Sequence, residues 1–500
     1  MSEEKRVKAQ NESSELKRGI KGWQVGFIGL GGVIGSCYFL GLGICISDMG
    51  PAVFIAFAIV GIIVYGLMIS YAELLVNLPR KGSFVSYTSD FLGPTVSTGF
   101  GWAFWINWVC YVPSEAIAVA TVLQSLTGAS SSTSYVAFAV GALLALTIIN
   151  LCAVDIFAKI ESGLAITKVC VIILFIIVAF GIWVGLWGSD GFLGGTVNFG
   201  DADAGFTSQL FPNGSLIVLT SMVTVLVTFQ GTEIVGLSAA EAENPDKSVP
   251  KACKSVTYRI VALYLVPIVL LIMIFPTGLG SDATPVFADA LKLYDMNGIA
   301  LIMSAVVLIA AFSCANTGFY GTVRAMYGLS IEGLAPKALS KVNKSGNPKN
   351  AVLLTLAFMW VVLIIGLVSQ LTGALESLYE SLLSMSGFTG SVAWLGICAS
   401  WIVFRKRLKK RGYDPETCLK ARVRKGQRWV PWFSIIAQVI CLFMMAFGEG
   451  QLLIFFIACA AIFGPMIVRQ ITVKTGHVRE VNALGSDEKT FEETFPDLNK

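Results

Sequence analysis

Apolar segments follow one another along almost the whole chain, and each is long enough to cross a lipid bilayer as a helix. A transmembrane helix needs about 20 predominantly apolar residues. Runs of this kind occupy 22–46, 51–76, 97–126, 135–154, 163–187, 215–240, 256–279, 298–328, 351–372, 379–404, 431–448 and 452–470. Hydrophobic residues make up 55% of the chain and charged residues only 14%, too few charges for a water-soluble surface around 500 residues. We therefore predict an all-α polytopic membrane protein with about twelve transmembrane helices, or eleven if the turn at 448–450 does not separate the last two.

Charged residues between the runs predict the orientation of the chain. Basic residues gather in the loops on the same side as the N-terminus, at Arg80 and Lys81, Lys247 to Lys254, Lys337 to Lys349 and Arg405 to Arg428. The opposite loops contain Asp48, Asp190, Asp201, Asp203, Asp282, Asp289, Asp295 and Glu376, with Lys292 as their one base. Since basic loops stay in the cytoplasm, we expect a multi-pass protein of the cell membrane, in contact with membrane lipid, with both termini cytoplasmic. The net charge of +4 then reflects loop asymmetry and does not indicate nucleic-acid binding.

Lys168 is the one charged residue within the fifth run. A cation in the middle of a membrane helix costs on the order of 3 kcal/mol, so such residues normally face the protein interior and serve ion or substrate movement. The alternative is snorkelling, in which a lysine near a helix end extends its ammonium group to the interface. Lys168 could do so because it lies only about two turns after Lys159 and Glu161, the charged residues that precede the run. The first interpretation makes the chain a transporter candidate.

The first run is rich in glycine, which occurs at positions 26, 29, 31, 32, 35, 41 and 43. Glycine lowers helix stability, and membrane backbone leaves helical geometry only where protein or a hydrated cavity satisfies its polar groups. We predict a helix break at Gly31, Gly32 and Gly35. For Gly26 and Gly41 we favour close helix packing through small residues.

The sixth run contains a second interruption, TFQGTEIVG, in which Gln230, Thr232 and Glu233 place polar groups inside an apolar segment. Five spans separate the two interruptions, so they cross the membrane in opposite directions. This arrangement is typical of inverted repeats in transporters. We predict a five-plus-five inverted repeat followed by two further helices.

The predicted organisation has seven segments. They are a cytoplasmic tail (1–19), the first repeat (20–187), an external loop (188–214), the second repeat (215–404), a basic cytoplasmic loop (405–430), the last two spans (431–472) and a C-terminal cytoplasmic tail (473–500). Both tails are polar, and we expect them to be poorly ordered. Residues 281–297 contain an amphipathic stretch that we expect to lie against the external face.

Two facing helix breaks can bind a zwitterion with backbone groups alone. Half-helix N-termini offer N–H groups to a carboxylate, and unwound carbonyl groups accept hydrogen bonds from an ammonium group. The predicted substrate-binding residues are Ile34, Gly35, Ser36 and Cys37 in the first break, and Thr228, Phe229, Gln230 and Gly231 in the second. The substrate that fits this pair of sites is an α-amino acid.

Three further side chains have alternative interpretations. Phe229 could be an aromatic gate over the ligand or a packing residue. Glu233 follows the break directly, and it could titrate, form a hydrogen bond with the opposing broken segment or pair with a cation; we assign it to proton coupling together with Lys168. Glu115, near the kink expected at Pro113, could contact a cationic substrate, belong to a proton path or be a buried structural acid.

Other chemistries have no support in the sequence. The eleven cysteines are scattered singly, and the only histidine, His477, lies in the polar tail. This pattern indicates neither a metal site nor a disulfide framework, and no cofactor is expected apart from the proton as coupling ion. Without a metal set or a pairing of nucleophile and base in the spans, we expect no enzyme.

Several motifs resemble a known family. They are GGVIGSCYFLG, AITKV around Lys168, VTFQGTEIVGLSAAEAENPDKSVPKA, NTGFYGTVRAMYGLSIEGLAPKAL and MSGFTGSVAWLGICASW. Together they are similar to amino acid permeases of the amino acid–polyamine–organocation superfamily, including bacterial lysine, aromatic amino acid and γ-aminobutyrate permeases. The likeness runs through nearly the whole chain.

The resemblance implies a five-plus-five inverted-repeat fold with two extra helices and uptake of amino acids coupled to protons. It matches Lys168 with a lysine that occupies the cation place of sodium-coupled relatives. It also matches Gly35, Ser36 and position 37 with the carboxylate site and Glu233 with the acid of the sixth span. Relatives commonly have glycine where this chain has Cys37, so we expect a different tolerance for ligand shape here.

The predicted function is therefore amino acid import by proton symport through alternating access. An amine or polyamine carrier and an amino acid exchanger are alternatives with the same fold. A sensor that binds amino acids without moving them is a third. For the substrate side chain we favour cationic over neutral amino acids.

Overall fold

A computed structural model gives the structure of the chain. It describes residues 32–80, 82, 84–151, 154–187, 206–238, 245–275, 285–343, 347–373, 377–476 and 490–498. The N-terminal tail, the first glycines of the first run, most of the predicted loop 188–214 and residues 477–489 of the last tail lie outside the described residues.

The described part of the chain is helical and contains no β-strand. The elements are η1 (Cys37–Gly41), α3 (Leu42–Met49), η2 (Gly50–Ala52), α4 (Val53–Asn77), α5 (Phe84–Leu92), α6 (Pro94–Thr127), α7 (Ser132–Leu151), α8 (Val154–Trp183), α9 (Phe206–Leu210), α10 (Leu216–Thr220), α11 (Met222–Val227), α12 (Ile234–Ser238), α13 (Pro245–Ile274), α14 (Val286–Lys292), α15 (Asn297–Ile331), η4 (Lys337–Ser340), α16 (Lys349–Leu371), α17 (Leu378–Lys410), η5 (Lys425–Gln427), α18 (Trp429–Met444), η6 (Met445–Phe447), α19 (Leu452–Lys474) and α20 (Phe491–Thr494). Within these residues, nine helices are long and apolar enough to cross a membrane. The all-α fold class is as predicted, whereas the count of twelve spans and the inverted repeat stay predictions.

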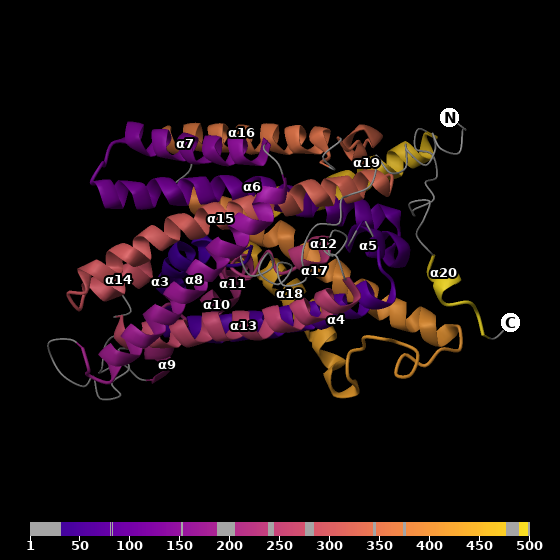
Figure 1. Cartoon of the computed structure of the whole chain (residues 1–500), viewed down its shortest axis with the longest axis horizontal. Helices are drawn as coiled ribbons and strands as arrows, with labels where there is room; N and C mark the ends of the chain where they lie inside the picture. Colours follow the sequence, from indigo (N-terminus) through magenta and orange to yellow (C-terminus); the bar gives the residue numbers. More distant parts are fainter. Residues whose placement is uncertain are drawn as a thin grey trace.

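The helices differ in how far neighbours cover them, and this sorts them into a centre and a rim (Figure 1). In α6 and α17, 78% of the most apolar window is buried inside the protein, against 17% in α7 and 11% in α19. Helix α6 packs along α15 and α17 in the centre, and α4 runs beside α13. Since the side chains of α7 and α19 are apolar and yet exposed, these helices provide the surface that lipid tails can cover.

Both predicted interruptions contain non-helical residues, and of the first one Gly31 lies outside the described residues. In the first run, residues 32–35 form turns and bends before a helix begins at Ser36 and continues through the π-helix η1 into α3. In the sixth run, α11 ends at Val227, residues 228–233 form turns, and α12 begins at Ile234. Neither apolar run is therefore one continuous helix.

Two predictions about the ends of segments need correction. The C-terminal tail was expected to be poorly ordered, but residues 490–498 include the short helix α20, whose Phe491 is buried together with Phe495. These rings pack against Phe91 and Phe404, because two phenylalanines four residues apart give the polar tail one apolar face. The basic loop expected from residue 405 also begins later, because α17 continues to Lys410.

The last turns of α17 are held by a buried ion pair. Arg405 donates from Nε and Nη2 to the two carboxylate oxygens of Glu73 on α4, each at 2.7 Å. Glu73 also accepts the backbone N–H of Val423 at 2.6 Å. Burial of both charges is tolerated because the geometry is bidentate and the remaining lone pairs are used. The loop after α17 is thereby held against α4, while α14 covers η1 at the other end with its buried residue Phe287.

Candidate functional site

The two helix breaks lie directly against each other. Gly231 has a φ of 103°, a conformation that favours glycine. A Cβ atom at this position would lie 2.7 Å from the carbonyl carbon of Gly32 and 3.2 Å from the amide nitrogen of Val33. Only a residue without a side chain allows the two unwound backbones to approach this closely.

A tyrosine on α13 joins the two breaks. The hydroxyl group of Tyr264 lies 3.0 Å from the carbonyl oxygen of Val33 and 2.8 Å from that of Thr228. From α15, the thiol of Cys314 donates to the carbonyl oxygen of Gly32 at 3.0 Å. Buried carbonyl groups released from helical bonding are thus satisfied by side chains from neighbouring helices, as membrane backbone requires.

The predicted carboxylate site holds a carboxylate of the protein itself. The backbone N–H of Ser36 donates to both oxygens of Glu115, each at 3.1 Å. The Ser36 hydroxyl lies 3.0 Å from the hydroxyl of Tyr379 on α17. Glu115 reaches this amide from α6 because Gly35 leaves room: a Cβ there would collide with the Glu115 carboxylate and lie 2.8 Å from the Tyr111 hydroxyl.

The neighbours of that amide have other surroundings. The N–H of Gly35 donates to the carbonyl oxygen of Val33 at 3.1 Å. Ile34 and Cys37 are buried beside it, and the Cys37 thiol lies 4.0 Å from the carbonyl oxygen of Thr224. The arrangement shows that Ser36 can bind a carboxylate, since it does so with Glu115.

The predicted ammonium site is a cluster of carbonyl groups under an aromatic stack. The carbonyl oxygen of Thr228 accepts from Tyr264, and that of Phe229 accepts from the Thr232 hydroxyl at 3.2 Å. The ring of Phe229 stacks on Tyr264 at 4.7 Å between centroids and touches Phe57 on α4. In this conformation Phe229 is a packing residue beside the break.

Two polar side chains anchor the second break to α17. The amide nitrogen of Gln230 donates to the carbonyl oxygens of Ser386 and Gly387, at 3.1 and 3.2 Å. Glu233 is buried and accepts from the N–H of Gly231 and from Nε1 of Trp394, at 3.1 and 2.9 Å to Oε2. Protonation or removal of the Glu233 carboxylate would therefore act directly on the backbone of the break.

Lys168 is fully buried on α8, so the snorkelling alternative does not describe it. The ionisable groups that act on its charge come from three helices: Glu161 on α8 itself, Cys314 on α15 and Glu115 on α6. Since Cys314 and Glu115 both contact the first break, the charge of Lys168 is coupled electrostatically to the candidate site.

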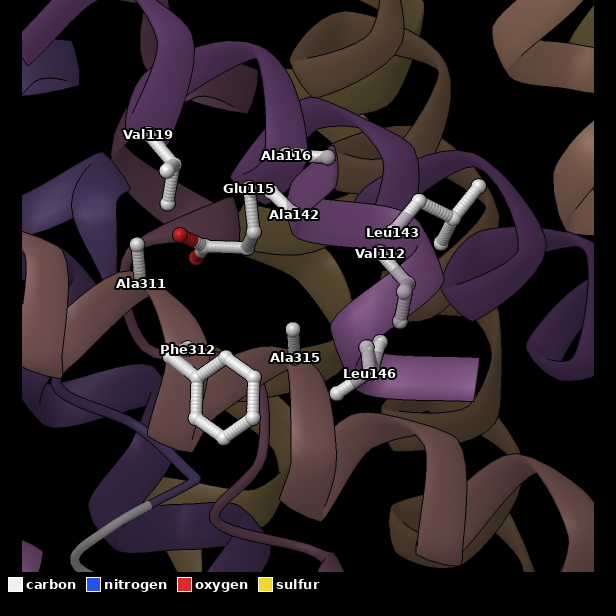
Figure 2. A pocket seen from close by; sticks show the side chains of 10 residues that line it. All are labelled: Val112, Glu115, Ala116, Val119, Ala142, Leu143, Leu146, Ala311, Phe312 and Ala315. Atoms are coloured by element: carbon white, nitrogen blue, oxygen red, sulfur yellow. The ribbon is translucent and has the colours of Figure 1, made fainter. Parts of the chain in front are cut away.

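A small hollow opens on the other side of Glu115 (Figure 2). Its lining comes from α6, α7 and α15: Val112, Glu115, Ala116, Val119, Ala142, Leu143, Leu146, Ala311, Phe312 and Ala315. Glu115 is the only charged residue in this lining, and the alanines have small side chains that leave the hollow open.

The described residues contain no group of three or more metal-binding side chains, and their cysteines are free. Several site residues were not predicted from the sequence. Tyr264 is one tyrosine in an apolar run, and Tyr379 stands at the start of another, so neither position gave a signal. Glu161 fell just before the predicted fifth span, which α8 in fact extends to Val154.

The amino acid permease family model matches residues 24–477, which is nearly the whole chain. The chain belongs to the amino acid permease family. It is thus a multi-pass membrane protein from a family of transporters and not of enzymes, and amino acid transport is the activity of this family.

Named relatives support the assignment. This permease is 33% identical over 451 residues to the lysine-specific permease LysP of Lactococcus lactis subsp. cremoris, covering 88% of this chain and 85% of the relative. It is 33% identical over 404 residues to the amino-acid permease RocC of Bacillus subtilis, with 81% and 84% covered. The γ-aminobutyric acid permease of Escherichia coli is 30% identical over 443 residues, with 88% and 91% covered.

The solved structures support the fold. A mutant of the manganese transporter from Eremococcus coleocola superposes with a TM-score of 0.54 over 92% of this permease and 97% of that chain. Sequence identity is only 13%, so the likeness concerns the fold and not the cargo.

Proposed function

We propose that this permease imports amino acids across the cell membrane by proton symport, with both termini in the cytoplasm and alternating access between the two sides. The contact between Gly32 and Gly231 carries the proposal, because it brings two sets of non-helical backbone groups to one place. A substrate that touches both breaks can favour one relative position of the helices that contain them.

The proposed substrate is an α-amino acid. Its carboxylate would bind the amides of Gly35, Ser36 and Cys37, and its ammonium group the carbonyls of Thr228 to Gln230. A substrate carboxylate that binds Ser36 must displace Glu115, because the same N–H serves both. Two carboxylates near one amide repel each other, so a proton on Glu115 would favour the exchange.

For the substrate side chain we propose a preference for cationic over neutral amino acids. The lysine permease among the relatives agrees with this preference, whereas the γ-aminobutyric acid permease shows how far ligands vary in the family. Once displaced from Ser36, the protonated Glu115 would still offer its carbonyl oxygen as a hydrogen-bond acceptor to a cationic side chain.

Proton coupling is assigned to Lys168 and Glu233. Burial disfavours the charged form of the Lys168 ammonium group. A change in the charge of a neighbouring group can therefore decide whether Lys168 binds or releases a proton. Glu233 holds the N–H of Gly231, which links its charge to the shape of the second break. If protonation tightens substrate binding, substrate binding must equally favour protonation.

Uptake of radiolabelled lysine into proteoliposomes tests the proposal. An inward proton gradient should drive accumulation in the native permease, and Lys168→Ala should abolish gradient-driven accumulation while it leaves some binding. Full gradient-driven uptake in Lys168→Ala would contradict the coupling assignment.

Two further arms separate the alternatives. Competition by arginine but not by its decarboxylated amine would support recognition of the carboxylate over an amine carrier. Uptake that occurs only when the proteoliposomes contain amino acid, with or without a proton gradient, would identify an exchanger. Binding without any uptake would identify a sensor.

A further inference from the structure

Glu161 is a second buried charge on the helix that contains Lys168. The two residues are seven positions apart on α8, which is about two turns or 10.5 Å along the axis, so they share one face. Both side chains have no solvent-exposed surface. Helical side chains lean toward the N-terminus of their helix, which directs Lys168 toward Glu161.

The carboxyl group of Glu161 is surrounded by hydroxyl groups of α15. Oε1 accepts from the hydroxyl of Ser313 on α15. Oε2 is buried, and the group beside it on α15 is the hydroxyl of Thr317, one turn beyond Ser313. Two hydroxyl groups are weak compensation for a fully buried carboxylate, and the cost of burying its charge falls when a proton binds there.

Other titratable groups face this pair from the helices packed against α8. From α15, Cys314 acts on both Lys168 and Glu161. From α6, Glu115 acts on Lys168. On α13, the buried titratable groups among the described side chains are Cys253 and Tyr264. Glu161 and Glu115 are the acids among these neighbours, and Glu161 is the one on the same helix as Lys168.

We propose that Glu161 accepts the coupling proton from Lys168 on its way to the cytoplasm, an inference that rests on the proposed proton symport. In this step an N–H bond of the Lys168 ammonium breaks and an O–H bond forms on Glu161. The charged pair becomes a neutral amine and a neutral acid, so net charge is conserved. Glu161 lies toward the N-terminal end of α8, which is the cytoplasmic end in the proposed orientation, and it acts as a relay that does not touch substrate.

The test compares two kinds of uptake in proteoliposomes that contain purified permease. Lysine accumulation driven by an inward gradient of about one pH unit can reach about tenfold for one proton per substrate. Counterflow exchange, with lysine on both sides and no gradient, needs no net proton transfer. Glu161→Gln should reduce accumulation to about onefold and keep exchange within about twofold of the native rate, whereas loss of a merely structural contact should lower both together.

Glu332→Gln is the matched control. Glu332 is also a buried acid that accepts from a serine hydroxyl, that of Ser86, but it lies at the end of α15. Both kinds of uptake should survive in this variant. Loss of gradient-driven uptake in Glu332→Gln equal to that in Glu161→Gln would overturn the special role of Glu161.

The outcomes separate the inference from the function on which it rests. If the native permease shows no gradient-driven uptake, the symport proposal fails. If the native permease is coupled and Glu161→Gln has the same accumulation and pH profile, symport stands and the relay is overturned. If Glu161→Gln does not fold, Glu161→Asp is used instead, because it keeps the carboxyl group but moves it away from Lys168 by one methylene group. A shifted pH profile of uptake with exchange retained supports the relay. An unchanged pH profile overturns it.

Discussion

Gly231 lies so close to Gly32 that neither the side chain of alanine nor any larger one fits between the two backbones. One residue belongs to the first apolar run and the other to the sixth, so their contact fixes how the two broken segments meet. The carbonyl and amide groups around this contact are the ones to which we assign substrate binding.

Replacing Gly231 with alanine should abolish transport and destabilise the permease. The new Cβ would overlap Gly32, and a φ of 103° is itself strained for alanine, by about 1–3 kcal/mol. The control is Gly141→Ala on α7, where a Cβ meets no atom within 4 Å and helix propensity should raise stability slightly. Thermal unfolding in detergent and lysine uptake measure both. Native-like uptake by Gly231→Ala would be incompatible with the close contact.

Replacing Tyr264 with phenylalanine should weaken the junction of the breaks while it keeps the aromatic stack. The change removes a hydroxyl that lies within hydrogen-bond distance of two buried carbonyl groups, so we expect a loss of about 1–3 kcal/mol and a weaker affinity for lysine. Tyr294→Phe removes a hydroxyl bonded to the carbonyl of Ile274, away from the breaks, and serves as the control. Equal affinities in the two variants would argue against the bridging role.

Replacing Glu115 with glutamine should make substrate affinity less dependent on pH. In the native permease, lysine affinity should rise as pH falls, because protonation of Glu115 removes the charge that competes for Ser36. The neutral amide cannot titrate, so the slope of affinity against pH should flatten. Asp289→Asn, in an exposed pair with Lys292, should leave the slope unchanged. An unaltered slope in Glu115→Gln would exclude this competition.

Replacing Phe491 with alanine should release the C-terminal segment from its site beside α5 and α17. Loss of a buried phenylalanine costs about 3–5 kcal/mol, which would raise hydrogen exchange of residues 490–498 by roughly a hundredfold or more if that segment opens by itself. Leu498→Ala changes a side chain that is largely exposed and should have little effect. Unchanged protection in Phe491→Ala would mean that the contact with Phe404 and Phe91 does not hold the tail.

The sequence predicted the helix breaks because glycine and polar residues inside apolar runs have a direct physical meaning. It could not predict which groups meet there. Glu115 and Ser36 are 79 positions apart, and only packing brings them together. Glu161 was missed because polarity alone placed the start of its span too late, and the docking of Phe491 was missed because a single apolar pair is weak evidence in a polar tail.

The most direct test of substrate binding at the two breaks is a structure of the permease with a bound amino acid, chosen as the one of the twenty that raises the melting temperature most. We predict the ligand carboxylate at the amides of residues 35–37, with Glu115 displaced, and the ligand ammonium group at the carbonyls of residues 228–230. A ligand bound elsewhere, such as in the hollow between α6, α7 and α15 with the Glu115–Ser36 contact intact, would contradict this prediction.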